Sequence, residues 1–403
     1  MENQNPETEQ QKRLRSARRV VVKLGTGIVT GGEGQFNAAH LEPVARTIAL
    51  LMKQGRQIVL VSSGAVGLGR GRLHLHRDRL NDMVVKQACA AVGQSLLMHE
   101  YEKLFRSQDI SLAQVLLTEG DFVDRTRYSN LRQTMEALLK LGVLPIVNEN
   151  DTVSTAELDY LNIRAGERIF SDNDRLAGLV MSHIEADALI LLTDVDGLMQ
   201  LGPSGAMDAD ARMIPLVEEI TPELKALALG PSEGGRGGML TKLAAAEIAM
   251  QSGGVAVIAN GTKPETLLKL FEGEPAGTVF LSKTRMAGKR RWIAYAAGVR
   301  GRVIVNAGAR DALTGGKASL LASGVTSVEG EFDAAEVVSI VDASGLEFAR
   351  GISDYSRGDA LGMIGENKAG NGSHATEGDT AGRTSKRATV LVKRDNIVLL
   401  DRK

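Results

Sequence analysis

The chain has 403 residues, of which 43% are hydrophobic and 24% are charged, a balance typical of a globular protein with two or three domains. The 48 Lys and Arg residues almost equal the 49 Asp and Glu residues, which excludes a protein that binds polyanions through a strongly basic surface. Because Cys89 is the only cysteine and no apolar run is long enough to cross a bilayer, we exclude disulfide-stabilised and membrane-spanning classes and expect a cytoplasmic protein.

The first sixteen residues are polar, carry both charges and lack the apolar core of a signal peptide. We expect residues 1–16 to form a flexible N-terminal arm. Beyond them, short runs of Val, Ile and Leu alternate with longer stretches of helical spacing. The strand-like runs lie at 20–22, 58–61, 115–117, 143–147, 188–192 and 255–258, and the helical stretches at about 38–54, 80–105, 131–141, 174–184 and 241–251.

Continuous hydrophobicity is typical of strands that are buried on both faces of a parallel sheet. Its alternation with helices predicts that residues 17–296 form a three-layer α/β/α sandwich with a mainly parallel sheet. Polar residues and glycines follow every predicted strand, in the segments KLGTG, SSGA, TE, NEND, TD and NGT. Because ligands of open α/β sheets bind at the carboxyl ends of the strands, these segments locate a site.

After Trp292 the helical periodicity fades, and strand-like runs appear at 303–305, 337–341, 346–349 and 390–392. The segment DASG, which separates two of these runs, has the composition of a hairpin turn. Residues 297–403 are therefore predicted to form a small β-rich domain. Residues 366–387 contain no bulky apolar side chain, and we expect them to be a flexible polar insertion in this domain.

Lys23 follows the first predicted strand and is itself followed by Gly25 and Gly27. A lysine in this place can reach a transferring phosphoryl group while glycine amides approach its oxygens. The alternative is a lysine at a sheet edge beside an ordinary turn. The chain has no P-loop motif, no dinucleotide-binding glycine fingerprint after a strand and no His/Cys cluster for zinc.

Two clusters of acids and amides follow, at Asn148–Asp151 and Ser171–Asp174. Ser171 and Asp174 have the spacing of a capping box, so the second cluster either caps a helix or binds cationic groups, including lysines. The glycine-rich segment 234–242 leads into a helix and is either a site for nucleotide phosphates or a linker that ends at a helix cap. Lys242 in the first turn opposes the helix dipole, which favours a functional role.

Together these features suit phosphoryl transfer, which needs charge stabilisation more than covalent chemistry. Lys23 and Lys242 can offset negative charge on the phosphoryl oxygens, and an aspartate between them can hold them in place. Segments between about residues 17 and 295 resemble the amino acid kinase family. They are VVVKLGTGIVT, IVLVSSGAVGLGR, KQACAAVGQ, QVLLT, DRTRYSN, GVLPIVNENDTVSTAEL, FSDNDRLAGLV, LILLTDVDGL and GRGGMLTKLAAAEIA.

The segment PIVNENDTV followed by SDND is similar to the members that phosphorylate glutamate rather than aspartate, acetylglutamate or uridylate. The β-rich remainder resembles a PUA domain. The resemblance implies ATP-dependent phosphorylation of the γ-carboxylate of L-glutamate to L-glutamyl 5-phosphate, the first step of proline biosynthesis. It also implies Mg²⁺ bound to the phosphates rather than to protein ligands, proline as a feedback inhibitor, and a homodimer or homotetramer.

By motif position, the resemblance implies that Lys23 and Lys242 flank the transferring phosphoryl group and that Asp174 orients them. It assigns glutamate binding to Ser63, Asp151 and Asn173. ATP would be held by Lys23, Thr193, Asp194, Arg236, Gly237, Gly238, Met239, Leu240, Thr241 and Lys242. The chain departs from the family at Arg236, where a small hydroxyl residue is usual, and at Gly27, where serine is common.

Two alternatives stay open. One keeps the fold and changes the acceptor to another carboxylate. The other is an RNA-binding or regulatory protein with an idle kinase domain, since PUA domains elsewhere bind RNA. Nine acidic residues outnumber six basic residues between positions 298 and 365, and this balance argues against RNA binding by the predicted PUA domain.

Overall fold

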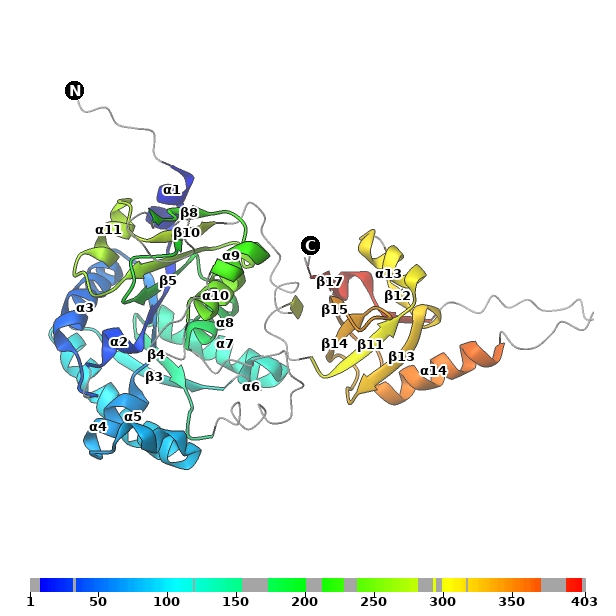
Figure 1. The fold of residues 1–403 in the computed structure, drawn as a ribbon, viewed down its shortest axis with the longest axis horizontal. Helices are drawn as coiled ribbons and strands as arrows, with labels where there is room; N and C mark the ends of the chain where they lie inside the picture. The colour runs from blue at the N-terminus through cyan, green and yellow to red at the C-terminus, as the bar shows by residue number, and fades with distance from the viewer. Residues whose placement is uncertain are drawn as a thin grey trace, which may run out of the picture. The chain divides into compact units, whose positions relative to one another are not determined.

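The computed structural model describes residues 8–31, 34–118, 120–153, 173–200, 212–227, 238–281, 293–294, 299–316, 318–370 and 389–400. The chain divides into two compact units, Met1–Met286 and Ala287–Lys403. Each unit has its own sheet (Figure 1) and is described by itself. Within the described part of the chain, no helix combines the length and the apolar character needed to cross a bilayer.

The first unit is built on an eight-stranded sheet with the order β3-β4-β2-β1-β5-β9-β10-β8. Every pairing from β3 to β9 is parallel, whereas β10 is antiparallel to β9. The prediction of a mainly parallel sheet is therefore confirmed. The strands are β1 (Arg19–Leu24), β2 (Gln57–Ser62), β3 (Leu112–Leu117), β4 (Leu144–Glu149), β5 (Ala188–Thr193), β8 (Leu216–Val217), β9 (Val255–Asn260) and β10 (Thr278–Leu281).

Helices cover both faces of this sheet (Figure 1). On one face, α3 (Ala38–Lys53), α5 (Met83–Arg106) and α11 (Thr266–Glu272) share a hydrophobic core with alternate residues of the central strands. On the other lie α7 (Arg125–Lys140), α8 (Asn173–His183) and α10 (Met239–Gln251). Shorter elements are α2 (Thr26–Val29), α4 (Ala65–Arg72), η1 (Arg77–Asn81), α6 (Gly120–Val123), α9 (Pro222–Leu227), β6 (Met199–Gln200) and β7 (Arg212–Met213).

The N-terminal residues correct one expectation. Residues 9–16 form helix α1 (Glu9–Ser16), which Thr8 caps through its side chain. Leu14 is buried in the core, and the side chain of Gln11 donates a hydrogen bond of 2.6 Å to the carbonyl of Gly273. The prediction of a flexible arm over residues 1–16 is wrong for this helix. Its single buried apolar side chain is too weak a periodic signal to predict a docked helix from sequence.

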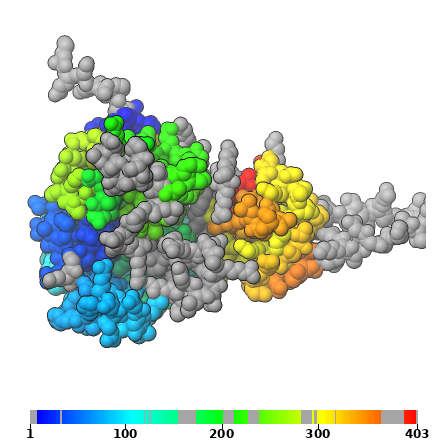
Figure 2. All heavy atoms as spheres, viewed as in Figure 1, coloured from blue at the N-terminus to red at the C-terminus, as the bar shows by residue number. Residues whose placement is uncertain are grey.

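Helices α4 and α5 pack unusually closely because each carries a glycine at the contact. A Cβ atom on Gly93 of α5 would lie 1.7 Å from the carbonyl oxygen of Ala65, and one on Gly69 of α4 would lie 1.8 Å from that of Cys89. Atoms of these two helices form the lower edge of the first unit in the space-filling view (Figure 2). The sequence predicts α5 but not the glycine-rich α4, whose formation depends on this contact.

The second unit contains a five-stranded sheet with the order β13-β11-β14-β15-β17 and a two-stranded sheet of β12 and β16. As predicted, Asp342–Gly345 form a hairpin turn, in which Asp342 Oδ1 accepts bonds from the backbone N–H groups of Ser344 and Leu346. The strands are β11 (Gly301–Val305), β12 (Leu320–Leu321), β13 (Val325–Gly330), β14 (Val337–Val341), β15 (Glu347–Ile352), β16 (Val390–Val392) and β17 (Ile397–Leu399).

This unit also contains two helices that the sequence did not predict, α13 (Ala307–Thr314) and α14 (Arg357–Gly370). Residues 366–370 belong to α14, so the prediction of a flexible insertion over 366–387 is wrong for these five positions. Residues 371–387 lie outside the described part of the chain. Helix α14 was missed because, among its side chains with described burial (residues 357–364), Ala360 and Ile364 are the ones that join the core, too few to mark a helical stripe.

Candidate functional site

The carboxyl ends of the parallel strands bring predicted site residues to one edge of the sheet. Strand β1 lies between β2 and β5, and Leu24 at its end is in register with Ser62 and Leu192. Lys23 is therefore the second-last residue of the central strand, with Ser63 following β2 and Thr193 ending β5. Helices α8 and α10 pack against each other on the face toward which Lys23 extends, and each begins at this edge.

Three buried charges meet where these elements converge. Lys23 Nζ lies 2.6 Å from Asp174 Oδ1, and Lys242 Nζ lies 3.1 Å from Asp174 Oδ2. Thr241 Oγ1 also donates a hydrogen bond of 2.9 Å to Asp174 Oδ2. We call Lys23, Asp174 and Lys242 the charged trio. Strand β1 supplies the first lysine, the first turn of α8 the aspartate, and the first turn of α10 the second lysine.

The trio is almost fully withdrawn from solvent, with exposures of 4% for Lys23, 0% for Asp174 and 7% for Lys242. Burial by itself raises the pKa of Asp174, but the two ammonium groups and the hydrogen bonds from Lys23 and Thr241 outweigh it, so the pKa is lowered. Asp174 is therefore a carboxylate that holds two cations in fixed positions. Such an arrangement suits an anionic group beside the lysines.

A second cluster, made of neutral groups, lies beside the trio. Asn173, the neighbour of Asp174, donates from Nδ2 to Ser62 O at 3.2 Å, to Ser63 Oγ at 3.0 Å and to Asn148 Oδ1 at 3.0 Å. We call Asn173, Asn148 and Gln94 the amide cluster, because Asn148 Nδ2 in turn donates to Gln94 Oε1 at 2.8 Å. Gly64, with φ +104°, allows the sharp turn that carries Ser63 from β2 into α4.

The structure thus joins two of the three residues predicted to bind glutamate, Ser63 and Asn173, by a direct hydrogen bond. Asp151 lies in the turn that follows β4, two residues beyond Glu149. The site prediction omitted Asn148, although it recognised the segment that contains it, and it omitted Gln94, Ser62 and Tyr101. Gln94 and Tyr101 lie seven residues apart on one face of α5, a spacing that ordinary core residues share, so the sequence carries no separate signal for them.

Tyr101 extends the neutral network into the core of the first unit. Its hydroxyl group lies 2.6 Å from Ser62 Oγ, and its ring packs edge-on against Phe36 with the ring centroids 5.7 Å apart. Burial is the main reason that the pKa of the Tyr101 hydroxyl lies above its usual range. The hydroxyl is therefore a neutral group that positions Ser62, which directly precedes Ser63.

The described residues predicted to bind ATP lie toward the carboxyl ends of β1 and β5 and at the start of α10. Thr193 is buried and donates from Oγ1 to Asp194 Oδ1 at 3.0 Å, while Asp194 itself is exposed. Gly238 caps α10, and its carbonyl accepts a bond of 2.8 Å from Thr241 Oγ1. Met239, Leu240, Thr241 and Lys242 form the first turn of that helix, whereas Arg236 and Gly237 lie outside the described residues.

Asp196 is a further polar residue at this end of the sheet that the site prediction did not include. It accepts a hydrogen bond of 2.8 Å from Asn260 Nδ2 and lies 2.6 Å from Lys263 Nζ. Hydrogen bonds from Lys263 and Asn260 lower the pKa of its carboxyl group. The group is therefore an anion that ties the loop after β5 to the end of β9.

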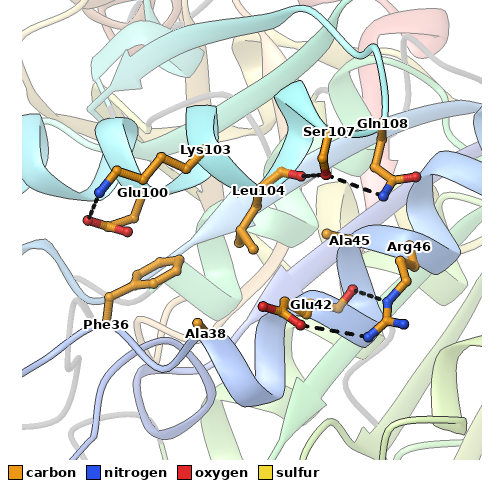
Figure 3. A pocket seen from close by; sticks show the side chains of 10 residues that line it. All are labelled: Phe36, Ala38, Glu42, Ala45, Arg46, Glu100, Lys103, Leu104, Ser107 and Gln108. Carbon is orange, nitrogen blue, oxygen red and sulfur yellow. Dashed lines mark hydrogen bonds and ion pairs between the residues drawn. The ribbon is translucent and has the colours of Figure 1, made fainter.

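A surface groove of about 480 Å³ lies between α3 and α5 (Figure 3). Phe36 and Leu104 contribute its apolar part, and the ion pairs Glu42–Arg46 and Glu100–Lys103 lie along its sides. None of the predicted site residues lines the groove. The hollow therefore does not mark the site formed at the strand ends.

Comparison with known proteins gives a consistent assignment for both units. Residues 18–260 match the model of the amino acid kinase family, and residues 301–369 match that of the PUA domain. Glutamate 5-kinase from Myxococcus xanthus is 46% identical over 358 residues, which cover 88% of this chain and 91% of that protein. The proteins of the same name from Moorella thermoacetica and Citrifermentans bemidjiense are 46% and 42% identical, and the matches cover 88% and 96% of this chain and 92% and 99% of those proteins.

Proposed function

The chain belongs to the amino acid kinase family and, within it, to the glutamate 5-kinases, and from this premise we propose that the charged trio is its phosphoryl-transfer centre. The activity is the ATP-dependent phosphorylation of the γ-carboxylate of L-glutamate to L-glutamyl 5-phosphate, the first step of proline biosynthesis. The observation that carries the site assignment is the contact of one buried carboxylate, Asp174, with two buried ammonium groups.

The two lysines act on the phosphoryl group as it passes from ATP to the substrate carboxylate. Lys23 and Lys242 stabilise the negative charge on the phosphoryl oxygens, while Asp174 keeps both ammonium groups in place before the substrates bind. Because the trio is buried, water screens this attraction weakly. Preorganised charge of this kind lowers the barrier without a covalent enzyme intermediate.

Substrate binding is assigned to the groups around the trio. Ser63, Asp151 and Asn173 bind glutamate, and the hydrogen bond between Ser63 and Asn173 supports a shared role. Lys23, Thr193, Asp194 and the segment from Arg236 to Lys242 bind ATP, in keeping with the backbone N–H groups that the start of α10 presents to phosphate oxygens.

Mg²⁺ accompanies ATP in this proposal. Among the described residues, no group of three or more His, Cys, Asp or Glu side chains could hold a metal ion, and both oxygens of Asp174 contact lysines. The residues at hand therefore suit a metal that is held by phosphate oxygens and water, as Mg²⁺ commonly is. When bound there, the ion neutralises phosphate charge, and the chain's own part is to position the lysines.

We further propose a domain division, a cellular location and a mode of regulation for this protein. The kinase domain spans residues 17–296 and the PUA domain residues 297–403, and the protein acts in the cytoplasm as a homodimer or homotetramer. Proline inhibits it by feedback at the glutamate site. The PUA domain serves assembly or regulation rather than RNA binding. Removal of the residues after Tyr295 tests this role, because an unchanged oligomer and an unchanged response to proline would contradict it.

The decisive experiment measures ADP release with L-glutamate, ATP and Mg²⁺ in the presence of hydroxylamine, which traps an acyl phosphate as a hydroxamate. We expect hydroxamate with L-glutamate and none with aspartate or N-acetylglutamate. Hydroxamate with a different carboxylate would change the substrate and keep the reaction. For substitutions of the trio lysines, Lys103→Met is the matched control, because Lys103 is an exposed lysine of α5 outside the trio and its loss should not affect the rate.

A further inference from the structure

Two buried polar atoms on either side of Asn148 have no hydrogen-bond partner among the residues that the structure describes. They are Oδ1 of Asn173 and Nε2 of Gln94. An unpaired buried donor or acceptor is costly in a folded protein, so such atoms call for an explanation. Both lie in the amide cluster, next to a residue assigned to the substrate.

The backbone determines which atom of each amide is left over. Asn148 Oδ1 accepts a bond of 2.9 Å from the backbone N–H of Glu149, so this atom must be the oxygen. Nδ2 of Asn148 then donates to Gln94, whose Oε1 must face it. Gln94 Nε2 therefore points elsewhere as an unused donor. By the same reasoning, Asn173 donates to the carbonyl of Ser62, which leaves its Oδ1 as an unused acceptor.

Gln94 is held in this position by a rigid part of the fold. It lies on the buried face of α5 with Leu97 and Tyr101, and the adjacent Gly93 permits close contact with α4. Tyr101 ties the same helix to Ser62. Because α5 is anchored to both β2 and β4, the side chain of Gln94 cannot turn to another partner without breaking its bond to Asn148.

The unused donor, Gln94 Nε2, and the unused acceptor, Asn173 Oδ1, lie on opposite sides of the Asn148 amide. Together they match the two charged groups of an α-amino acid. The ammonium group needs an acceptor and the α-carboxylate needs a donor. We propose that Gln94 is a substrate-specificity residue that donates a hydrogen bond from Nε2 to the α-carboxylate of the amino-acid substrate. The reacting γ-carboxylate must lie at the trio. Gln94 is farther away, because Asn148 and Asn173 lie between it and the trio. The inference rests on the proposed function.

The test compares Gln94→Glu and Gln94→Leu with the unaltered protein. Gln94→Glu keeps the size of the side chain and the acceptor for Asn148 but replaces the donor by a carboxylate oxygen. We expect the KM for L-glutamate to rise about tenfold or more, as for a lost hydrogen bond to a charged group, while kcat and the KM for ATP change little. Gln108→Glu, two residues beyond the end of α5 and in the lining of the surface groove, is the matched control.

A substrate analogue identifies the group that Gln94 contacts. L-Glutamate whose α-carboxylate is converted to an amide should be a poor substrate for the unaltered protein, and the Gln94 variants should lose little further activity toward it. Equal use of both substrates by the unaltered protein would overturn the inference without any variant. An unchanged KM for L-glutamate in both variants, or an equal rise in the KM for ATP with a lower Tm, would also overturn it. If the unaltered protein forms no hydroxamate from L-glutamate, the proposed function itself fails.

Discussion

Asn173 and Asp174 are neighbours on the first turn of α8, yet they belong to clusters of different physical character. Asp174 holds full charges in a buried setting, at 2.6 and 3.1 Å from two ammonium groups. Asn173 joins neutral groups by hydrogen bonds of 3.0 to 3.2 Å. Charge that is fixed before binding suits the stabilisation of a transition state, whereas directional neutral groups suit the selection of a substrate.

The comparison predicts that damage to the trio lowers kcat and that damage around the amide cluster raises KM. One turn of one helix then serves chemistry through one residue and recognition through the next. Substitutions in either cluster and changes in pH can test this division.

The largest effect is expected for Lys242→Met, which removes one ammonium group of the trio. We expect kcat to fall about 10²- to 10³-fold, since the charge matters most in the transition state, while the KM for glutamate changes little. Steady-state kinetics with Lys103→Met as the control checks this. A raised KM for glutamate with an unchanged kcat would show that Lys242 binds substrate and does not stabilise the transition state.

The second test measures how stability depends on pH, because Asp174 at the start of α8 and His183 at its end should titrate in different pH ranges. His183 is 1% exposed and packs against Tyr128 and Phe122. Burial, aided by Arg132, lowers its pKa to about 4. Since the unfolded imidazole has a higher pKa, its neutral form stabilises the fold above about pH 6.5, and this contribution is lost as the pH falls toward 4.

We expect the free energy of unfolding to fall by up to about 3 kcal/mol across this window, and His183→Phe to remove that dependence. The pKa of Asp174 lies below the ordinary value of an aspartate, which is about 4. The carboxylate therefore contributes to stability above about pH 4, and this contribution is lost only as the pH falls through the lowered pKa. Denaturant titrations at several pH values measure both. If the unaltered protein lost stability above pH 7 and His183→Phe did not, the account of His183 would be wrong.

Asp151→Ala tests the recognition side of the division. We expect the KM for glutamate to rise about tenfold or more, with kcat and the KM for ATP nearly unchanged, because the loss of a charged contact in the ground state weakens binding rather than chemistry. Asp354→Ala in the second unit is the control, since it removes an acid that pairs with Lys393 there. A fall in kcat with an unchanged KM for glutamate would show that Asp151 acts in the chemical step and not in substrate binding.

The smallest effect is expected for Tyr101→Phe, which removes the hydroxyl that contacts Ser62 Oγ. Ser62 Oγ keeps its bond to the carbonyl of Ser63, so the loss should be about 1 kcal/mol in the free energy of unfolding, with a modest rise in the KM for glutamate. Thermal unfolding and kinetics measure the two effects. A large loss of kcat would connect Tyr101 to the trio instead.

Much of this site could be predicted because its residues lie at or next to the carboxyl ends of strands. Lys23, Ser63, Asn148 and Thr193 each lie at a strand end, and a parallel sheet must bring such ends together. Gln94 and Tyr101 could not be assigned in the same way, since they sit in mid-helix among apolar neighbours. Only their hydrogen bonds across the fold separate them from ordinary core residues.

The class of the fold, the order of its main strands and helices, and the family follow from the sequence, because periodicity and motifs are properties of short segments. Only the tertiary contacts decided how closely Lys23 and Lys242 approach the Asp174 carboxylate, that α1 docks and that α14 forms. They also decided which atoms of the amide cluster remain unused. These features depend on contacts between residues far apart in the chain, where burial and geometry outweigh local preference.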